Sequence, residues 1–325
     1  LDGNNLDITT DNNGAETFNK LDVQTTGSLT LDDHVYVTDT LFMNGSNINA
    51  TTDTLTLGSA SNAGTLVRNS GIVLGDMQRW IENTTDSYIY PLGNSSTYRP
   101  MTIQANSLSS TGYAVGYYTT TDPGDGGLSN IYEDSLYMVN TYDEGYWTLT
   151  ANGMNSGDYN VEVEATGYSS ADVISAGTRL MTRPDGATDW TLNGNHADAT
   201  GTTIRRNNVS TLSAEFAVSD TMSCMPTTSE VYAEDKVCAN TTESYTVMEH
   251  SGSDYRWFIT GGSQASGGIT DSITVDWGSS SSGKVQIVED NGCAIGDTVE
   301  LDIVINSIPS DPLPISGPNP DTIVE

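Results

Sequence analysis

The sequence predicts an all-β protein: a short β-solenoid-like N-terminal region, then an antiparallel β-sandwich, then an immunoglobulin-like β-sandwich. Three observations indicate this fold class. Only 17 % of the residues are charged, below the roughly 25 % of an average soluble domain, and Ser, Thr, Asn, Gly and Asp supply most of the polarity. Aromatic residues reach 8 %, whereas a disordered acidic chain lacks such core formers. Apolar and polar residues alternate over short runs between turn residues, with no helical period.

Residues 1–85 repeat a small unit in which two apolar residues flank a polar one and a polar turn follows. Examples are Leu29/Leu31, Val35/Val37 and Leu55/Leu57. Side chains at i and i+2 lie on one face of a strand. The units recur too closely for hairpins of ordinary strands, but they suit a chain that coils and stacks each short strand on the last. A β-solenoid is therefore predicted, with an irregular strand meander as the alternative.

Longer alternating runs follow in residues 86–222, for example over 113–118 and 159–164, and turn residues separate them. This spacing is typical of an antiparallel β-sandwich domain. Residues 223–308 repeat the pattern on a smaller scale and provide the seven strands of an immunoglobulin-like domain. Five of the ten prolines fall in residues 309–325, so we expect an extended tail that serves as a linker or donor strand.

The charge balance excludes two classes of partner. Lys and Arg number 11 against 43 Asp and Glu, which gives a net charge of −32. Nucleic acids and anionic membranes need a cationic footprint, so neither is expected to bind. No run of 18 apolar residues occurs, so we expect no membrane-spanning segment.

Three cysteines permit one disulfide and leave one thiol over. Cys238 precedes the first strong strand of the third block and Cys293 precedes its last, with Trp257 between them. A bond between Cys238 and Cys293 would link the two sides of a sandwich. A bond between Cys224 and Cys238 is the alternative.

Two sets of runs carry a resemblance. The runs at 54–58, 64–68 and 71–73, leading to 90–93 and 98–100, resemble surface proteins of Bacteroidetes that the type IX secretion system exports. Residues from Val237 through Tyr255-Arg256-Trp257 and Ile273–Gly278 to Asn291-Gly292-Cys293 are similar to the PKD-like modules of their adhesins. The resemblance implies an extracellular, cell-surface location.

The resemblance also implies covalent modification. Asp followed by Ser or Thr and then by an aliphatic residue or Met is the tripeptide to which organisms of this group attach O-glycans. The hydroxyls expected to carry glycans are therefore those of Thr40, Thr54, Ser135, Thr221, Ser272, Thr298 and Thr322. Such glycans would hydrate an exposed surface.

The sequence offers no reaction centre. The three histidines, His34, His196 and His250, lie in separate blocks, without the spacing of a transition-metal site. No Gly-x-Ser-x-Gly nucleophile motif occurs. We therefore expect no enzyme and no cofactor. Turn carboxylates, above all Asp122 and Asp125, are weak candidates for Ca²⁺ ligands.

Because no reaction centre is found, we infer the function from the arrangement of the β-modules. Stacked β-modules with a solvated acidic surface suit a fibre subunit or an adhesin stalk. We expect Thr322, Ile323 and Val324 to add as an edge strand to a neighbouring molecule, which gives head-to-tail self-association into a fibre or array. The alternative is a carbohydrate- or surface-binding module with a stacking platform of tyrosines, namely Tyr113, Tyr117, Tyr118, Tyr132, Tyr137 and Tyr142.

Overall fold

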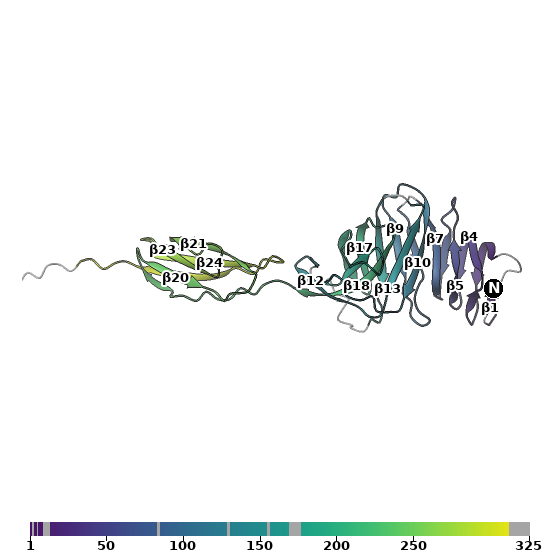
Figure 1. Cartoon of the computed structure of the whole chain (residues 1–325), viewed down its shortest axis with the longest axis horizontal. Helices are drawn as coiled ribbons and strands as arrows, with labels where there is room; N and C mark the ends of the chain where they lie inside the picture. Colours follow the sequence, from purple (N-terminus) through teal and green to yellow (C-terminus); the bar gives the residue numbers. More distant parts are fainter. Residues whose placement is uncertain are drawn as a thin grey trace, which may run out of the picture. The chain divides into compact units, whose positions relative to one another are not determined.

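The structure, a computed structural model, describes residues 1, 3–4, 6–8, 14–82, 85–128, 131–154, 157–168 and 177–311. The described ranges contain β-strands, turns and loops and no α-helix, which confirms the predicted all-β class. The chain divides into two compact units, Leu1–Ser223 and Cys224–Glu325 (Figure 1).

The strands of the first unit are β1 (Leu6–Ile8), β2 (Ala15–Val23), β3 (Leu29–Leu31), β4 (His34–Met43), β5 (Ile48–Leu57), β6 (Thr65–Arg68), β7 (Val73–Ile81), β8 (Ser87–Tyr90), β9 (Met101–Ala105), β10 (Gly112–Thr119), β11 (Tyr132–Glu133), β12 (Leu136–Thr141), β13 (Tyr146–Asn152), β14 (Tyr159–Glu164), β15 (Arg179–Arg183), β16 (Asn195–Thr200), β17 (Thr203–Val209) and β18 (Ala214–Ser223). Those of the second unit are β19 (Lys236–Cys238), β20 (Thr242–Thr246), β21 (Asp254–Thr260), β22 (Gly262–Ser266), β23 (Ser272–Trp277), β24 (Ser282–Asp290) and β25 (Val299–Asn306).

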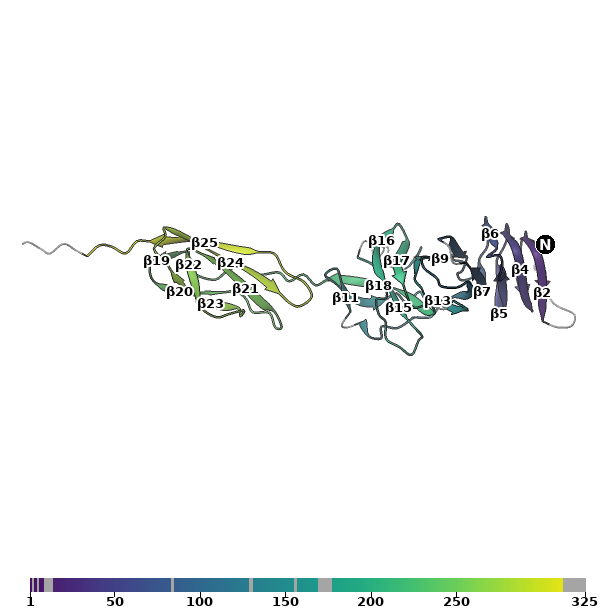
Figure 2. The ribbon, with the colours of Figure 1, turned by 90° about the horizontal axis from the view of Figure 1, so that it is seen from above.

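The first seven strands form the predicted solenoid, with parallel strands stacked along three sides (Figure 2). The first side contains β1, β3 and the first halves of β5 and β7. The second side contains the first halves of β2 and β4 and the second halves of β5 and β7. The third side contains the second halves of β2 and β4 together with β6. The long strands β2, β4, β5 and β7 therefore each run along two sides.

The apolar pairs of the sequence repeat fill the solenoid interior. Leu29/Leu31, Val35/Val37 and Leu55/Leu57 are all fully buried. Each pair packs beside the pair of the next coil, since Val35 pairs with Leu55 and Val37 with Leu57. Burial of each such side chain contributes roughly 1.5–3 kcal/mol. The i, i+2 spacing thus specifies which face of each strand turns inward.

A ladder of amide and carboxylate groups joins successive coils at one corner. The Asn44 side chain donates from Nδ2 to Asp22 Oδ1 at 2.8 Å, and the Asn69 side chain donates from Nδ2 to Asn44 Oδ1 at 2.7 Å. The backbone continues the same stacking, because Asn44 N donates to Val23 O and Asn69 N to Met43 O. These bonds fix the register of the coils where the apolar pairs end.

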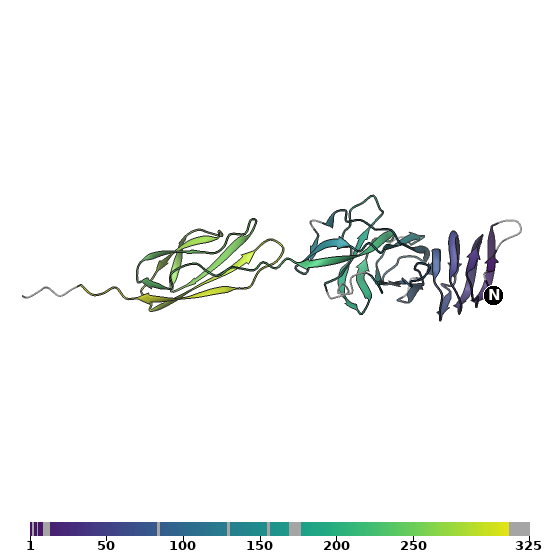
Figure 3. The same ribbon diagram turned by 90° about the horizontal axis from the view of Figure 1, so that it is seen from below.

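The solenoid continues into the sandwich without a break in the core. Strand β7 pairs with β5 in parallel on one edge and with β10 antiparallel on the other. It thereby joins both regions into one 13-stranded sheet whose main order is β1-β3-β5-β7-β10-β13-β18-β12-β11. One hydrophobic cluster extends from Ile8 to Val218. The boundary expected near residue 85 therefore marks a change from parallel to antiparallel pairing within one compact unit (Figure 3).

A five-stranded sheet, β16-β17-β14-β9-β8, supplies the second layer of the sandwich. Trp147 lies fully buried in its core, donates from Nε1 to Arg99 O at 2.8 Å, and contacts Tyr118 and Tyr168 at ring-centroid distances of 5.1 and 6.2 Å. Gly116 lets the layers approach, because a Cβ there would lie 2.7 Å from the Tyr90 ring. Burial raises the pKa of Tyr90, whose hydroxyl donates to Ala114 O at 3.1 Å.

The second unit packs a four-stranded sheet, β19-β25-β24-β21, on a three-stranded sheet, β20-β23-β22. Seven strands were predicted for this block, and its sandwich is confirmed. Tyr245 and Trp277 meet edge to face in its core at 5.9 Å, and Trp277 Nε1 donates to the Tyr245 hydroxyl at 2.9 Å. Gly283 makes room for this indole, since a Cβ there would lie 2.3 Å from it.

Candidate functional site

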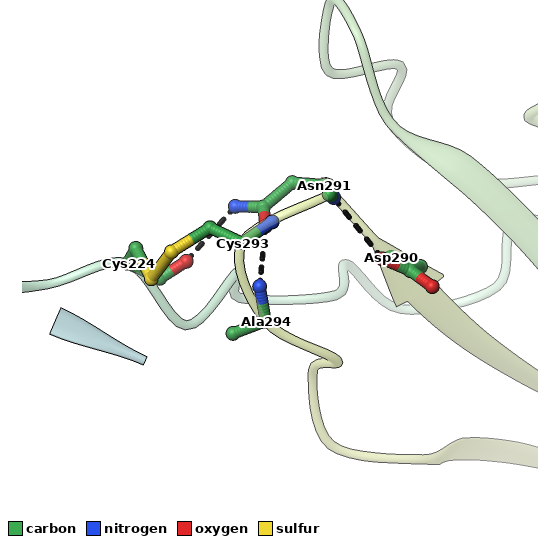
Figure 4. Close-up of a disulfide and its surroundings, with 6 residues drawn as sticks. Cys224, Asp290, Asn291, Cys293 and Ala294 are labelled. Atoms are coloured by element: carbon green, nitrogen blue, oxygen red, sulfur yellow. Dashed lines mark hydrogen bonds between the residues drawn. A yellow bond between two sulfur atoms is a disulfide. The ribbon is translucent and has the colours of Figure 1, made fainter. Parts of the chain in front are cut away.

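The disulfide differs from both predicted pairings. Cys224 and Cys293 form the bond, with their Cα atoms 6.2 Å apart, and Cys238 is free and exposed. The prediction of a Cys238–Cys293 bond is therefore wrong. Strand alternation explains why. Val237 of β19 points into the core of the second unit, so Cys238 next to it points outward. The segment entering the second unit passes instead beside the turn after β24 (Figure 4).

A single amide organises the turn that holds Cys293. Asn291 Nδ2 donates to Cys224 O at 2.9 Å, and Asn291 Oδ1 accepts from the backbone N–H groups of Cys293 and Ala294 at 3.1 and 3.0 Å (Figure 4). Gly292, which adopts φ 79°, donates its N–H to Asp290 Oδ1 at 3.0 Å. The two cysteines are thus brought together by the Asn291 turn, a feature that spacing alone does not encode.

The candidate Ca²⁺ ligands make internal hydrogen bonds. Asp122 Oδ1 accepts from Gly124 N at 2.7 Å, which closes a turn. Asp125 Oδ1 accepts from the backbone N and the hydroxyl of Thr141 at 2.7 and 3.0 Å, which ties the loop to β12. No group of three or more metal-ligating His, Cys, Asp or Glu side chains occurs in the described ranges.

The predicted glycan acceptors lie in different environments. Thr40 is 8 % exposed, Thr54, Ser135, Thr221 and Ser272 are half-buried, and Thr298, just before β25, is exposed. Thr221 also donates its hydroxyl to Gly177 O at 2.6 Å. Thr298 is therefore the acceptor that the fold leaves most open. Thr322, with the assembly residues Ile323 and Val324, lies outside the described residues.

Sequence reasoning missed a cluster of buried charges. Glu133 forms ion pairs with Arg179 Nε and with Arg206 Nη2, each at 3.0 Å, and the two arginine side chains are 2 % and 1 % exposed. Burial, followed by the charge of Arg179, lowers the pKa of the neighbouring His196. A few arginines spread through an acidic chain were the only available signal. The cluster pairs its charges internally and is suited to fixing the fold.

The predicted tyrosine platform does not form one surface. Tyr118 and Tyr142 are buried in the core. Tyr132 and Tyr137 meet edge to face across β11 and β12, with ring centroids 6.3 Å apart. Tyr113 lies opposite Trp80 of β7, a residue that the prediction did not include. Neighbours along a strand point to opposite faces, so Tyr117 and Tyr118 of β10 cannot belong to one surface.

Comparison with known families identifies the second unit. Residues 223–303 match the model of a family described as the PKD-like domain. The C-terminal part of this chain carries a PKD-like domain. The match contains both disulfide cysteines and most of the seven strands. It covers a quarter of the chain, and the resemblance to PKD-like modules is confirmed for this part. No curated protein matches the chain.

Two further findings bear on location. The PKD-like domain and its disulfide suggest an extracellular protein, because disulfides persist in oxidising compartments. Within the part of the chain that the structure describes, no helix could cross a membrane.

Proposed function

We propose that this protein is a non-enzymatic structural module of the cell surface, either an adhesin stalk or a filament subunit. The observation that carries the proposal is a PKD-like domain, closed by a disulfide, in a chain whose remaining described residues form one solenoid and sandwich with a continuous core. Such domains supply shape and spacing. The described side chains supply no metal cluster, and the buried charges of Glu133, Arg179 and Arg206 are paired with one another.

The proposal extends to source and export, on the resemblance of the solenoid and sandwich runs. We place the protein among Bacteroidetes surface proteins carried by type IX secretion. The test is the native host: surface proteolysis of intact cells should remove the protein, and disruption of the secretion system should retain it inside. Protein that stays protected in normal cells would contradict the extracellular assignment.

Self-association by strand addition is the finer mechanism that we propose. Ile323 would fill a pocket on a neighbour while Thr322 and Val324 pair with its strand edge. Sedimentation velocity and electron microscopy of the full chain should show concentration-dependent assemblies that Ile323→Asp abolishes. Ile308→Asp is the matched control, because Ile308 is 59 % exposed just beyond the last strand. A monomer at every concentration would contradict this mechanism and leave the stalk role standing.

O-glycosylation is proposed at the Asp-Ser/Thr tripeptides other than the buried Thr40, with Thr298 as the most accessible acceptor among the described residues. Material from the native host should exceed the 34.6 kDa of the bare chain, and Thr298→Ala should remove one glycan mass. Thr40→Ala is the control that should leave the mass of the glycans unchanged, since Thr40 is 8 % exposed. An intact mass equal to that of the bare chain would end the proposal.

A further inference from the structure

An open hollow of about 320 Å³ lies on the outer face of the second side of the solenoid. Strand β2 contributes Thr17, strand β4 contributes Tyr36 and Thr38, and β7 contributes Trp80. The turn that begins at Gly58 forms one wall with Ser59 and Ala60. The volume lies at the small end of the roughly 300–1,000 Å³ typical of ligand sites.

The strand register places the two aromatic rings on one surface. Thr17 pairs with Tyr36 and Tyr36 with Thr56, which pairs in turn with Gln78 of β7. Trp80 lies two residues beyond Gln78, so its side chain leaves the same face. Tyr36 and Trp80 are both half-buried, and neither belongs to the solenoid interior. The rings therefore form part of a surface and not of a core.

Neighbouring side chains hold both rings in place. The His34 ring stacks on Tyr36 with a centroid distance of 4.4 Å and an interplanar angle of 5°, and His34 Nε2 hydrogen-bonds Thr56 Oγ1 at 2.9 Å. Trp80 packs edge to face on Tyr113 at 5.4 Å. Rings fixed before binding lose little conformational entropy when a ligand arrives. The hollow is thus preorganised.

The polar groups of the two rings are available to a ligand. Neither the Trp80 indole N–H nor the Tyr36 hydroxyl has a hydrogen-bond partner within the described residues, and neither atom is among the buried unpaired ones. Thr17, Thr38 and Ser59 add hydroxyls to the rim. The Thr38 hydroxyl donates to Phe18 O at 3.4 Å and Ser59 Oγ lies 3.4 Å from Ser61 Oγ, so the Thr38 oxygen keeps a free acceptor position. None of the described lining residues is charged. The site therefore presents two apolar ring faces with neutral hydrogen-bond donors and acceptors around them.

We propose that this hollow, defined by Tyr36 and Trp80, binds a neutral carbohydrate. The C–H face of a sugar ring packs on an aromatic face, while its hydroxyls reach the indole N–H, the Tyr36 hydroxyl and the rim hydroxyls. This site goes beyond the proposed structural role and does not depend on it. A stalk with this site would also attach to a glycan.

The charge of the chain and the size of the hollow favour a neutral sugar over other ligands. The chain carries a net charge of −32, which repels acidic sugars and other anions from a site without a cationic side chain. A purely apolar ligand would leave the indole N–H of Trp80 and the hydroxyl of Tyr36 unpaired, at a cost for each group that loses water. The small volume also favours one or two sugar rings over a folded partner.

The test uses the full chain on an array of neutral polysaccharides, namely starch, cellulose, xylan, mannan and β-1,3-glucan, with alginate as an acidic polysaccharide and a hydrophobic dye for comparison. We expect binding to at least one neutral polysaccharide and none to alginate. Trp80→Ala and Tyr36→Ala should each weaken that binding at least tenfold, whereas Trp80→Phe, which keeps a ring, should weaken it less.

Two variants keep the test independent of folding. Ala60→Arg fills the hollow from an exposed turn position without removing a ring, and it should abolish binding while the melting temperature stays unchanged. Tyr132→Ala removes an exposed aromatic of β11, 51 % exposed and remote in sequence from the hollow, and it should bind as the unaltered chain does. Failure to bind any neutral polysaccharide, binding that survives Ala60→Arg, or binding of the dye alone would overturn the proposal.

Discussion

Removal of the Cys224–Cys293 bond gives the sharpest test of how the PKD-like domain is held together. The bond joins residues 69 apart in sequence and so encloses nearly all strands of the domain. In the chain-entropy model, a loop of this length stabilises the folded state by about 4 kcal/mol. A domain of this size has a total stability of about 5–15 kcal/mol, so the loss is a large fraction of it.

The assay is urea unfolding of the full chain. Hydrogen exchange detected by mass spectrometry monitors the unfolding, so that the midpoint of each unit is measured separately. With a slope of about 1–3 kcal/mol per molar urea, Cys293→Ser should lower the midpoint of the PKD-like domain by roughly 1.5–4 M. Peptides of the first unit should unfold at an unchanged midpoint, because the bond lies entirely within the second unit.

Cys238→Ser is the matched control. Cys238 is exposed and unpaired, so its replacement should shift the midpoint by less than the equivalent of about 0.5 kcal/mol. Non-reducing peptide mapping should recover Cys224 linked to Cys293. Recovery of Cys238 in the disulfide, or an equal loss of stability in both variants, would refute the assignment and the entropy argument based on it.

Three further predictions concern the first unit. Arg206→Leu should cost about 3–5 kcal/mol, because it breaks a buried ion pair and leaves Glu133 less well paired; a change in melting temperature of only a degree or two would contradict this. Burial raises the pKa of Asp76, so the folded state binds protons more tightly than the unfolded state and stability falls as pH rises through the folded pKa. Asp76→Asn should therefore stabilise the protein at pH 7 and remove that slope from a plot of unfolding free energy against pH, and a variant less stable at pH 7 would count against the reasoning. Gly75→Ala should destabilise the solenoid by about 2 kcal/mol or more, since φ is 95° and a Cβ would lie 2.3 Å from Ala50 O; chemical denaturation with an unchanged midpoint would show that the backbone relaxes.

The candidate sites were less predictable from sequence than the fold. Single tyrosines on β10 to β12 could be recognised, but Trp80 became part of an aromatic surface only when β7 paired with β10 and placed it opposite Tyr113. Tyr36 and Trp80 are 44 residues apart (80 − 36), and only the coiling of the chain brings them to one hollow. The same holds for Glu133 and Arg206, which no local pattern links.

The sequence alone determined the properties that depend on local spacing. The i, i+2 apolar pairs such as Val35/Val37 specified strands and their inward faces, and turn residues specified where strands end, because both effects act within a few residues. The tertiary structure alone decided which distant groups meet. Cys293 bonds Cys224 because the Asn291 turn lies beside the segment entering the domain, while alternation along β19 turns Cys238 outward. Contacts of this kind depend on how turns and strands pack together in three dimensions, and spacing along the chain does not contain that information.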